Sequence, residues 1–473
     1  MEYIDVFKKL FEAKFQQACL SVKELSSAGS NRKYFRLQNN SISVIGTYSN
    51  LVEENEAFFY VADKLKKTNV NVPEVYIVDV SKMFYIQEDV GDKSAYQLIK
   101  EDKTLDVLLF YKSIINDLIE IQINADKGFD YSKCYPKEKF DIDSIINDLD
   151  YFKYYFIKFF DIPFNETFLG YDFNSLAKYI NSKEYYNYFM YRDFQTRNIH
   201  VFYDNKYYFD FQGARKGPLQ YDLASLLFSA RCSLNFKERE IILDYYIDNL
   251  SKYIDVKASD FKECYYHIVL LRVLQTFGAY GFRGLYERKS MFKEVIMPAM
   301  SNLQWIMDNT SVVSTFKELQ SILNKILNEY KHIIIDKFMT NKKLTVTVNS
   351  FSFRRGIPYD KHGNGGGFVF DCRFLPNPGL DHNLKIFTGL DLEIQNYFND
   401  KNIVKDFIVN CAKIVESSIK EYIVKNYENI SFSFGCTGGR HRSVYCSEQI
   451  AKLLQEKYGK DINIELKHWE IQK

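Results

Sequence analysis

Apolar residues recur with a period of two near the N-terminus, which predicts a small lobe built around a sheet. The stretches 33–38 (KYFRLQ) and 41–48 (SISVIGTY) alternate like the two strands of a hairpin, and 83–90 (MFYIQEDV) predicts a further strand. Between them, residues 53–69 predict a helix with acidic residues in its first turn and lysines in its last. We therefore expect an opening helix and a β-rich lobe over residues 1–90.

The following part of the chain changes to a helical period. Apolar side chains recur at every third or fourth position in residues 104–124, 143–160, 244–254 and 265–281. This pattern predicts a larger, mainly helical lobe over residues 91–310.

A second change of pattern comes near residue 340. Residues 312–331 predict one more amphipathic helix, inside a helical linker that we place at 311–342. Beyond the polar, basic TNKK at 340–343, strands alternate with helices, which predicts a separate α/β domain over residues 343–473. The strands expected there are 344–353, 368–375 and 430–436.

The composition describes a chain that can fill two or three cores and has no dominant charge. Hydrophobic residues make up 46% and aromatic residues 17%, and 62 Lys and Arg against 61 Asp and Glu leave a net charge of +1. The N-terminus lacks the pattern of a signal peptide and no apolar run approaches a membrane span, so we expect a cytoplasmic protein that does not bind membranes. Eight cysteines without a CxxC pair are expected to be reduced, buried thiols.

One group of polar residues has the spacing of a phosphotransferase centre. In YRDFQTRNIH, Asp193 is the candidate base for a substrate hydroxyl and Asn198 follows it; Asp210 comes after a hairpin that is expected to turn at Asp204 and Asn205. Phosphoryl transfer needs a proton acceptor together with amide and carboxylate oxygens that hold Mg²⁺. We therefore assign Asn198 and Asp210 to the metal, although the same residues at this spacing also occur as caps and turns.

Flanking segments strengthen this interpretation. Residues 24–37 predict a strand, a turn of small residues and a strand, the shape of a loop that folds over a triphosphate, although a plain hairpin has the same pattern. Asp222 begins a helix in GPLQYDLASLL and is expected to brace the catalytic loop, and Glu88 marks a hinge whose backbone is expected to meet adenine. The candidate phosphate contacts of the loop are Ser27, Gly29, Ser30, Asn31 and Arg32.

The order of these motifs resembles the aminoglycoside-phosphotransferase-like kinases, and most of all the bacterial kinases of N-acetylmuramate and N-acetylglucosamine. The resemblance covers about residues 1–310 and implies a protein-kinase-like, bilobal α+β fold, ATP and Mg²⁺ as cofactors and an amino sugar as acceptor. Gln212 matches the DFQ of this group, whereas Tyr191 stands where the group has histidine. The strand at 41–48 carries no lysine for the phosphates. The candidates for the missing charge are Arg32, Lys33 and Arg36.

The C-terminal region holds a second group of polar residues, typical of an anion site. Residues 431–454 predict a strand, a glycine-rich turn and a helix, so that backbone N–H groups and the helix N-terminus face a ligand. A purely structural turn is the alternative, and the run of cationic and titratable residues argues against it. The candidate ligand-binding residues of this turn are Thr437, Gly438, Gly439, Arg440, His441, Arg442 and Ser443.

The segment GCTGGRHRSV, with VNSFSFRRGIP at 348–358 and FDCRFLPNPGL at 370–380, closely resembles the C-terminal domain of the RNase adapter RapZ. The resemblance covers residues 343–473 and implies a pocket for glucosamine 6-phosphate. RNA binding and homo-oligomerisation through this domain stay open, because the Walker-type ATPase domain of RapZ proteins is replaced here by the kinase-like region. The resemblance adds three residues to the pocket: Asp371, Arg373 and Asn377.

Two functions remain open from the sequence. The preferred one is an ATP- and Mg²⁺-dependent kinase of an amino sugar in cell-wall recycling, whose C-terminal domain binds a phosphorylated amino sugar. The alternative is a regulatory adapter, in which a weak or inactive kinase fold carries a RapZ-like domain that binds RNA or a protein; the missing strand lysine favours it. An aminoglycoside-inactivating enzyme is a third reading, which the fused domain disfavours.

Overall fold

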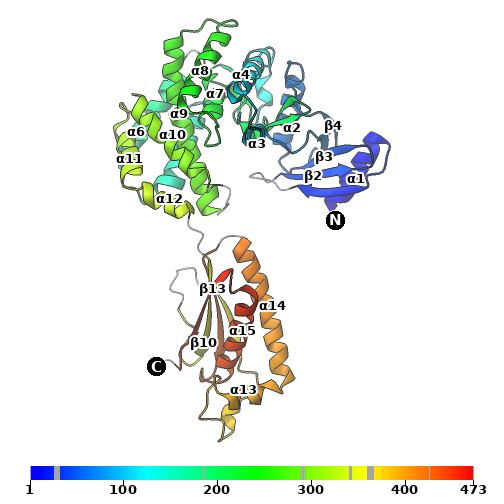
Figure 1. Cartoon of the computed structure of the whole chain (residues 1–473), viewed down its shortest axis with the longest axis vertical. Helices are drawn as coiled ribbons and strands as arrows, with labels where there is room; N and C mark the ends of the chain where they lie inside the picture. Colours follow the sequence, from blue (N-terminus) through cyan, green and yellow to red (C-terminus); the bar gives the residue numbers. More distant parts are fainter. Residues whose placement is uncertain are drawn as a thin grey trace. The chain divides into compact units, whose positions relative to one another are not determined.

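The structure is a computed structural model and divides into two compact units. The first unit runs to Phe338 and the second begins at Met339, with the segment 287–289 grouped with the second. In Figure 1 the first unit is coloured from blue to yellow-green and the second from yellow-orange to red. The structure describes residues 2–25, 32–183, 185, 187–287, 289, 292, 294–339, 343–359, 367–424 and 427–471.

An antiparallel sheet forms the N-terminal lobe of the first unit. Its strands lie in the order β1-β2-β3-β5-β4, and β2 and β3 form the predicted hairpin, with Lys33 opposite Tyr48. The helix α2 lies between β3 and β4 in the chain. The elements of this lobe are α1 (Glu2–Phe15), β1 (Ser21–Leu25), β2 (Lys33–Gln38), β3 (Ser43–Tyr48), α2 (Val52–Leu65), β4 (Val75–Val78) and β5 (Phe84–Glu88).

Alternation along the strands gives each face of this sheet its own helix. On β5, Phe84 and Ile86 pack in one cluster with α1, whereas Tyr85 between them packs in another cluster with α2. Gly46 of β3 faces α1, where an added Cβ would lie 2.7 Å from the ring of Phe7. The odd and even positions of the strands therefore separate an α1 face from an α2 face.

The C-terminal lobe of the first unit is mainly helical, with two short antiparallel sheets. Strand β6 pairs with β9, and β7 pairs with β8. The helices are α3 (Ala95–Glu101), α4 (Val107–Asn124), η1 (Tyr131–Lys133), α5 (Ile142–Phe152), η2 (Lys153–Ile157), α6 (Glu166–Asn181), η4 (Thr196–Asn198), α7 (Gln220–Leu227), α8 (Phe236–Leu250), α9 (Ala258–Ala279), η5 (Tyr280–Tyr286), α10 (Ile296–Asn309), α11 (Lys317–Asn328) and α12 (Lys331–Met339). The strands are β6 (Tyr188–Met190), β7 (Ile199–Phe202), β8 (Asn205–Tyr208) and β9 (Arg215–Gly217).

The hairpin β7–β8 turns one residue earlier than expected. Phe202 pairs with Asn205, so the two turn residues are Tyr203 and Asp204. Both have a positive φ, 46° and 63°, as a two-residue hairpin turn of this kind requires. Asn205 therefore belongs to β8 rather than to the turn.

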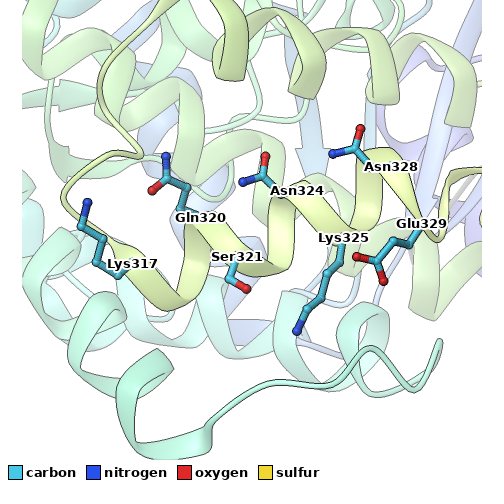
Figure 2. Close-up of a pocket in the computed structure, with 7 residues that line it drawn as sticks. All are labelled: Lys317, Gln320, Ser321, Asn324, Lys325, Asn328 and Glu329. Atoms are coloured by element: carbon cyan, nitrogen blue, oxygen red, sulfur yellow. The ribbon is translucent and has the colours of Figure 1, made fainter.

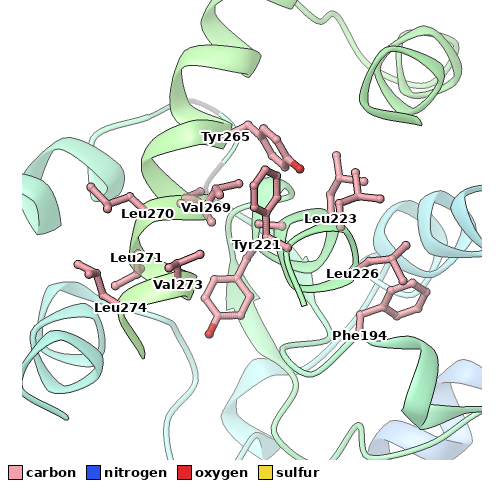
Figure 3. Close-up of a cluster of buried hydrophobic side chains, with 14 of the residues drawn as sticks. Phe194, Tyr221, Leu223, Leu226, Tyr265, Val269, Leu270, Leu271, Val273 and Leu274 are labelled. Carbon is pink, nitrogen blue, oxygen red and sulfur yellow. The ribbon is translucent and has the colours of Figure 1, made fainter. Parts of the chain in front are cut away.

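An apolar cluster lies next to the loop between β6 and β7. Figure 3 shows Phe194 of this loop beside Leu226 of α7. Leu223 of α7 and Val269 and Leu270 of α9 belong to the same cluster, and all of them are buried. This packing fixes the loop to the body of the helical lobe.

Helices α11 and α12 are part of the first unit. The helix predicted at 312–331 begins at Lys317 as α11, and its apolar stripe, with Leu319 and Ile322, is fully buried in the core of that unit. The segment that we expected to be a linker up to residue 342 therefore packs against the helical lobe as far as Phe338. The amphipathic pattern of this helix could be recognised in the sequence, but the part of the fold that its apolar face packs against could not.

A parallel sheet with its own core forms the second unit. Its strand order is β11-β12-β10-β13, and all three pairings are parallel. The elements are β10 (Leu344–Ser352), β11 (Phe368–Asp371), η7 (Pro378–Leu380), α13 (Leu392–Asn399), α14 (Asn402–Val424), β12 (Asn429–Cys436), α15 (Arg442–Tyr458) and β13 (Ile462–His468). The predicted fold class, a bilobal α+β domain followed by a separate α/β domain, is confirmed.

No helix in the described parts of the chain has both the length and the apolar character needed to cross a membrane. The eight cysteines are free thiols; six are buried, and Cys134 and Cys232 are half-buried.

Candidate functional site

The structure brings Asp193, Asn198 and Asp210 together. Asn198 closes the short helix η4 and donates from Nδ2 to the Asp193 carbonyl (2.9 Å) and to Asp210 Oδ2 (3.1 Å). Gln212 donates from Nε2 to the other carboxylate oxygen of Asp210 (2.9 Å). Since both bonds of the Asn198 amide use its nitrogen, its Oδ1 is the atom left to meet a cation.

Asp222 anchors the loop that carries Asp193, as the sequence predicted. Its carboxylate is fully buried in the first turn of α7 and accepts the backbone N–H groups of Tyr191 (2.8 Å) and Arg192 (2.7 Å), together with Gln122 Nε2 (3.1 Å). Burial raises the pKa of Asp222 to about 7, against the opposing effect of these three donors. Arg192 has a φ of 85°, so the anchor holds a strained residue directly before Asp193.

The electrostatics around Asp210 suit a bound cation. Asp210 remains accessible to solvent, yet the surrounding protein raises the pKa of its carboxyl, and the Asp193 carboxylate raises it further. Its φ of 66° adds backbone strain at the same point. One carboxylate and one amide oxygen are few ligands for a cation held by protein alone, but they fit Mg²⁺, which keeps waters and binds substrate phosphates.

A column of three packed aromatic rings, Phe58, Phe211 and Tyr191, lies next to Asp210 and Gln212 in the sequence segment that we call the metal motif (residues 210–212). Phe211, next to Asp210, stacks on Phe58 of α2 with ring centroids 5.0 Å apart and planes 4° apart. Tyr191 meets the edge of Phe211 at 6.1 Å, and its hydroxyl donates to the carbonyl of Phe209. Tyr191, which stands where the resembling kinases have histidine, therefore ties the catalytic loop to the metal motif through its buried ring and its hydroxyl.

Arg32 is the one predicted phosphate contact of the loop that the structure describes; Ser27, Gly29, Ser30 and Asn31 lie outside the described residues. Arg32 is 3% exposed and donates from Nε (3.3 Å) and Nη2 (3.0 Å) to Glu54 Oε2, and from Nη1 to the Tyr85 hydroxyl (3.1 Å). The sequence pattern identifies Glu54 only as an acidic residue in the first turn of a helix.

Glu88 lies at the end of β5, but its own N–H is engaged. The Glu88 N–H donates to the carbonyl of Glu74 (2.8 Å), and its side chain accepts the N–H of Glu74 (3.2 Å). The Glu88 N–H is therefore not available to donate to adenine.

Two further charged residues near Asp193 were not predicted from the sequence. Arg272 of α9 places Nη2 3.9 Å from Asp193 Oδ1 and donates from Nη1 to the Tyr221 hydroxyl (2.9 Å). Asp148 of α5 is 3.3 Å from Nη2 of Arg192. These groups come from helices far from the motif in sequence, so no local signal could have identified them.

The second candidate site lies where the parallel strands end. Ser352 closes β10, Asp371 closes β11 and Cys436 closes β12, and the pairing of β12 with both neighbours places these ends at one edge of the sheet. Gly438 is exposed, with open space where a Cβ would be, and Gly439 has a φ of +69°. The turn therefore leaves its backbone accessible ahead of α15.

The three residues Arg440, His441 and Arg442 differ in their surroundings. Arg440 is exposed and, within the described chain, its guanidinium makes no hydrogen bond, whereas Arg442 is buried and donates from Nη1 to the carbonyls of Arg373 (2.6 Å) and Leu375 (3.1 Å). Burial lowers the pKa of His441, so its imidazole is neutral near pH 7.

The side chain of Ser443 also turns inward. It is fully buried and its hydroxyl lies 3.2 Å from Cys436 Sγ. Thr437 accepts a hydrogen bond from Arg442 Nη2 (3.4 Å) at its Oγ1. The side chains of Arg442 and Ser443 therefore hold the turn together, and Arg440 is the cation of this run that faces solvent.

The three residues added by the RapZ resemblance lie at the end of β11 and on the loop that follows it. Arg373 makes a forked ion pair with Asp371 (2.6 to 3.0 Å), and its guanidinium lies over the Phe353 ring at 4.1 Å. This hydrogen-bonded cation lowers the pKa of Asp371. Asn377 caps the turn η7 by accepting the N–H of Gly379 (3.2 Å), so it shapes the loop.

A polar hollow along α11 contains none of these residues. Figure 2 shows its lining, all from this one helix: Lys317, Gln320, Ser321, Asn324, Lys325, Asn328 and Glu329. We attach no chemistry to it, because it lacks both an apolar lining and converging polar groups.

The fold defines a chain with a protein-kinase-like, bilobal α+β domain followed by a separate α/β domain. Residues 344–472 of that second domain match the RapZ C-terminal domain. A nucleotide-binding protein of Thermotoga neapolitana is 31% identical over 190 residues, covering 40% of this chain and 60% of the relative. One from Lactobacillus johnsonii is 36% identical over 167 residues, covering 34% and 56%. The chain thus spans little more than half the length of these relatives.

Solved structures similar to this chain include two kinds of kinase. A choline kinase from Streptococcus pneumoniae covers 64% of this chain and all of its own length, with 15% identity and a TM-score of 0.41. An ADP-bound aminoglycoside phosphotransferase, APH(2'')-Ib, covers 63% of this chain and 96% of its own, with 16% identity and a TM-score of 0.42. At these values the comparison bears on neither activity nor substrate.

Proposed function

We propose that the first unit transfers the γ-phosphoryl group of ATP to a hydroxyl of an amino sugar, of the N-acetylmuramate or N-acetylglucosamine type. The observation that carries this proposal is the convergence of Asp193, Asn198 and Asp210, held by a single amide and braced by Asp222. The choice of an amino sugar rests on the order of the sequence motifs.

The residues divide the work of the reaction. The Asp193 carboxylate takes the proton of the acceptor hydroxyl. At the same time the hydroxyl oxygen bonds to the γ-phosphorus of ATP, and the bond between this phosphorus and the ADP oxygen breaks. Asn198 and Asp210 would hold Mg²⁺, which supplies charge stabilisation for the transferring group when bound. Asp222 and the packed rings of Tyr191, Phe211 and Phe58 fix the position of the catalytic loop relative to Asp210.

A panel of acceptors tests the proposal. The full-length protein is incubated with ATP and Mg²⁺ and with N-acetylated and free hexosamines, and the phosphorylated position is located by NMR. Transfer to an N-acetylated hexosamine is expected. ATP binding without transfer to any sugar of the panel would contradict the proposal.

A regulatory adapter is the second candidate, and the uncharged Thr47 on the α2 face of β3 is the observation that favours it. In that case the second unit would act through RNA or a protein, and the first would only hold a ligand. Tight RNA binding by the full chain that glucosamine 6-phosphate does not displace would support the adapter.

A further inference from the structure

Strand β3 has no cation at the place where a kinase needs one. Protein kinases hold the nucleotide phosphates with a lysine of this strand, paired with a glutamate of the helix that follows. Here Val44 and Gly46 face α1, so alternation turns Ile45 and Thr47 toward α2. Neither side chain carries a charge.

Arg32, from the residue before β2, reaches over this place. Thr47 pairs across the sheet with Tyr34 of β2 and with Tyr85 of β5, so it lies between them. Arg32 starts on the β2 side, and its Nη1 reaches the Tyr85 hydroxyl on the β5 side at 3.1 Å. Its guanidinium therefore spans β3 at the level of Thr47.

The partner of Arg32 is on the helix where a kinase carries its glutamate. Glu54 lies in the first turn of α2, which directly follows β3 and packs on this face of the sheet. Arg32 gives it two N–H groups, at 3.0 and 3.3 Å, and the pair is largely shielded, with side chains 3% and 22% exposed. The ion pair between a cation and the glutamate of this helix is therefore formed, but the cation comes from the residue before β2 rather than from β3.

The same guanidinium lies beside the metal motif. It sits over the ring of Phe58 at 5.6 Å, and Phe58 stacks on Phe211, the neighbour of Asp210. Its positive charge also acts on the Asp210 carboxyl, in the direction that favours the ionised form. A phosphate held at Asp210 through a cation would thus be attracted by the positive charge of Arg32.

The other two candidates for the missing charge are engaged elsewhere. Lys33 is exposed, and its Nζ lies 4.7 Å from the ring centroid of Tyr3 in α1. Arg36 makes two forked ion pairs, with Asp89 and Asp92 after β5. Both arrangements direct these charges away from Glu54.

We propose that Arg32 has replaced the strand lysine as the residue that binds the nucleotide phosphates, with Glu54 as the helix residue that positions it. The inference rests on the proposed phosphotransferase function, since it assumes a nucleotide at Asp210. In this interpretation the phosphate-binding charge has moved from β3 to Arg32, and the phosphate site is kept.

The experiment measures binding of Mg²⁺·ATP to the full-length protein by calorimetry, with no acceptor present. Arg32→Gln is expected to weaken binding at least about tenfold, the effect of losing one charge-assisted bond. Lys33→Gln is the matched control, because it removes a charge one residue away on the exposed side, and it should bind like the wild type. Adding Thr47→Lys to Arg32→Gln should restore part of the affinity, because it returns the charge to β3 opposite Glu54.

The double variant Arg32→Gln, Glu54→Gln guards against misfolding, since it leaves no unpaired buried charge. It should unfold at a temperature close to that of the wild type and still bind Mg²⁺·ATP weakly. Wild-type affinity in this double variant, or an equal loss in Lys33→Gln, would overturn the role of Arg32 while leaving the kinase proposal intact. No nucleotide binding by the wild type would overturn both, and Arg32-dependent binding without sugar phosphorylation would overturn the sugar kinase alone.

Discussion

At the scale of single residues, Asp193 has the sharpest expected effect. Asp193→Asn keeps the shape of the side chain but removes the proton acceptor, so kcat should fall by about 100-fold or more. Affinity for Mg²⁺·ATP should stay near that of the wild type, because Asn198, Asp210 and Arg32 are unchanged. Steady-state kinetics and nucleotide titration measure the two effects separately. Similar turnover in both proteins would remove Asp193 from the mechanism.

Asp222 should make the stability of the first unit depend on pH. Its pKa is near 3.9 in an unfolded chain and about 7 in the folded protein, so folding disfavours its ionised form. Its contribution to the free energy of unfolding is therefore greatest below about pH 4 and decreases as the pH rises toward 7. Relative to the wild type, Asp222→Asn should gain stability between pH 5 and pH 8, as measured by denaturant unfolding. The same difference at both pH values would contradict the raised pKa.

Single residues of the catalytic group could be predicted because their spacing is local. Asp193, Asn198 and Asp222 belong to short motifs whose geometry follows from one loop and one helix start. The pair of Arg32 and Glu54 could not be predicted, because it depends on the register of three strands and on how α2 packs. Nor does spacing tell an exposed Arg440 from a buried Arg442.

At the scale of elements, the contact of α9 and η5 with the segment α5–η2 depends on two glycines. An added Cβ at Gly281 would lie 1.8 Å from the carbonyl oxygen of Tyr155, and one at Gly278 would lie 2.7 Å from the backbone of Phe152. Backbone cannot move aside as a flexible side chain can. Gly281→Ala should therefore lower the free energy of unfolding by at least about 3 kcal/mol.

Gly170 is the matched control for this contact. It lies within α6 and has open space around an added Cβ, so Gly170→Ala should raise stability by roughly 0.5–1 kcal/mol through helix propensity. Denaturant unfolding of the two variants compares them directly. Equal effects would show that the helices can separate without cost at Gly281.

Many of the elements could be predicted from the sequence, since the strands β2, β3, β5, β10 and β12 lie where strands are predicted. The segment 311–342 shows the limit of such patterns. Its amphipathic stripe predicts a helix, but only the fold reveals that Leu319 and Ile322 meet the helical lobe rather than another surface. The periodicity of apolar residues identifies the apolar face of a helix but does not show which element packs against that face.

At the scale of the whole molecule, the second unit should bind a phosphorylated amino sugar independently of catalysis. Glucosamine 6-phosphate should bind the full chain better than glucosamine, because the turn before α15 exposes the backbone at Gly438 and the guanidinium of Arg440. Arg440→Ala should cost roughly 1.5–3 kcal/mol of binding, the value of a charge-assisted bond, without changing the unfolding temperature. Calorimetry with both sugars measures this.

Arg442→Ala is the contrasting variant. Its guanidinium holds the carbonyls of Arg373 and Leu375, so its loss should lower the unfolding temperature of the second unit. Equal affinity for the sugar with and without phosphate in the wild type would exclude an anion site at this turn.

The parallel order of the C-terminal sheet has an evolutionary consequence. Strands β10, β11 and β12 end at one edge. The residues predicted for the second site lie at the end of β11, in the loops after β11 and β12 and in the first turn of α15, all of them after Met339. Loops at such an edge accept insertions and substitutions while the strands beneath keep their packing. Substitutions in these loops can therefore alter this edge of the sheet without changing the core of the unit.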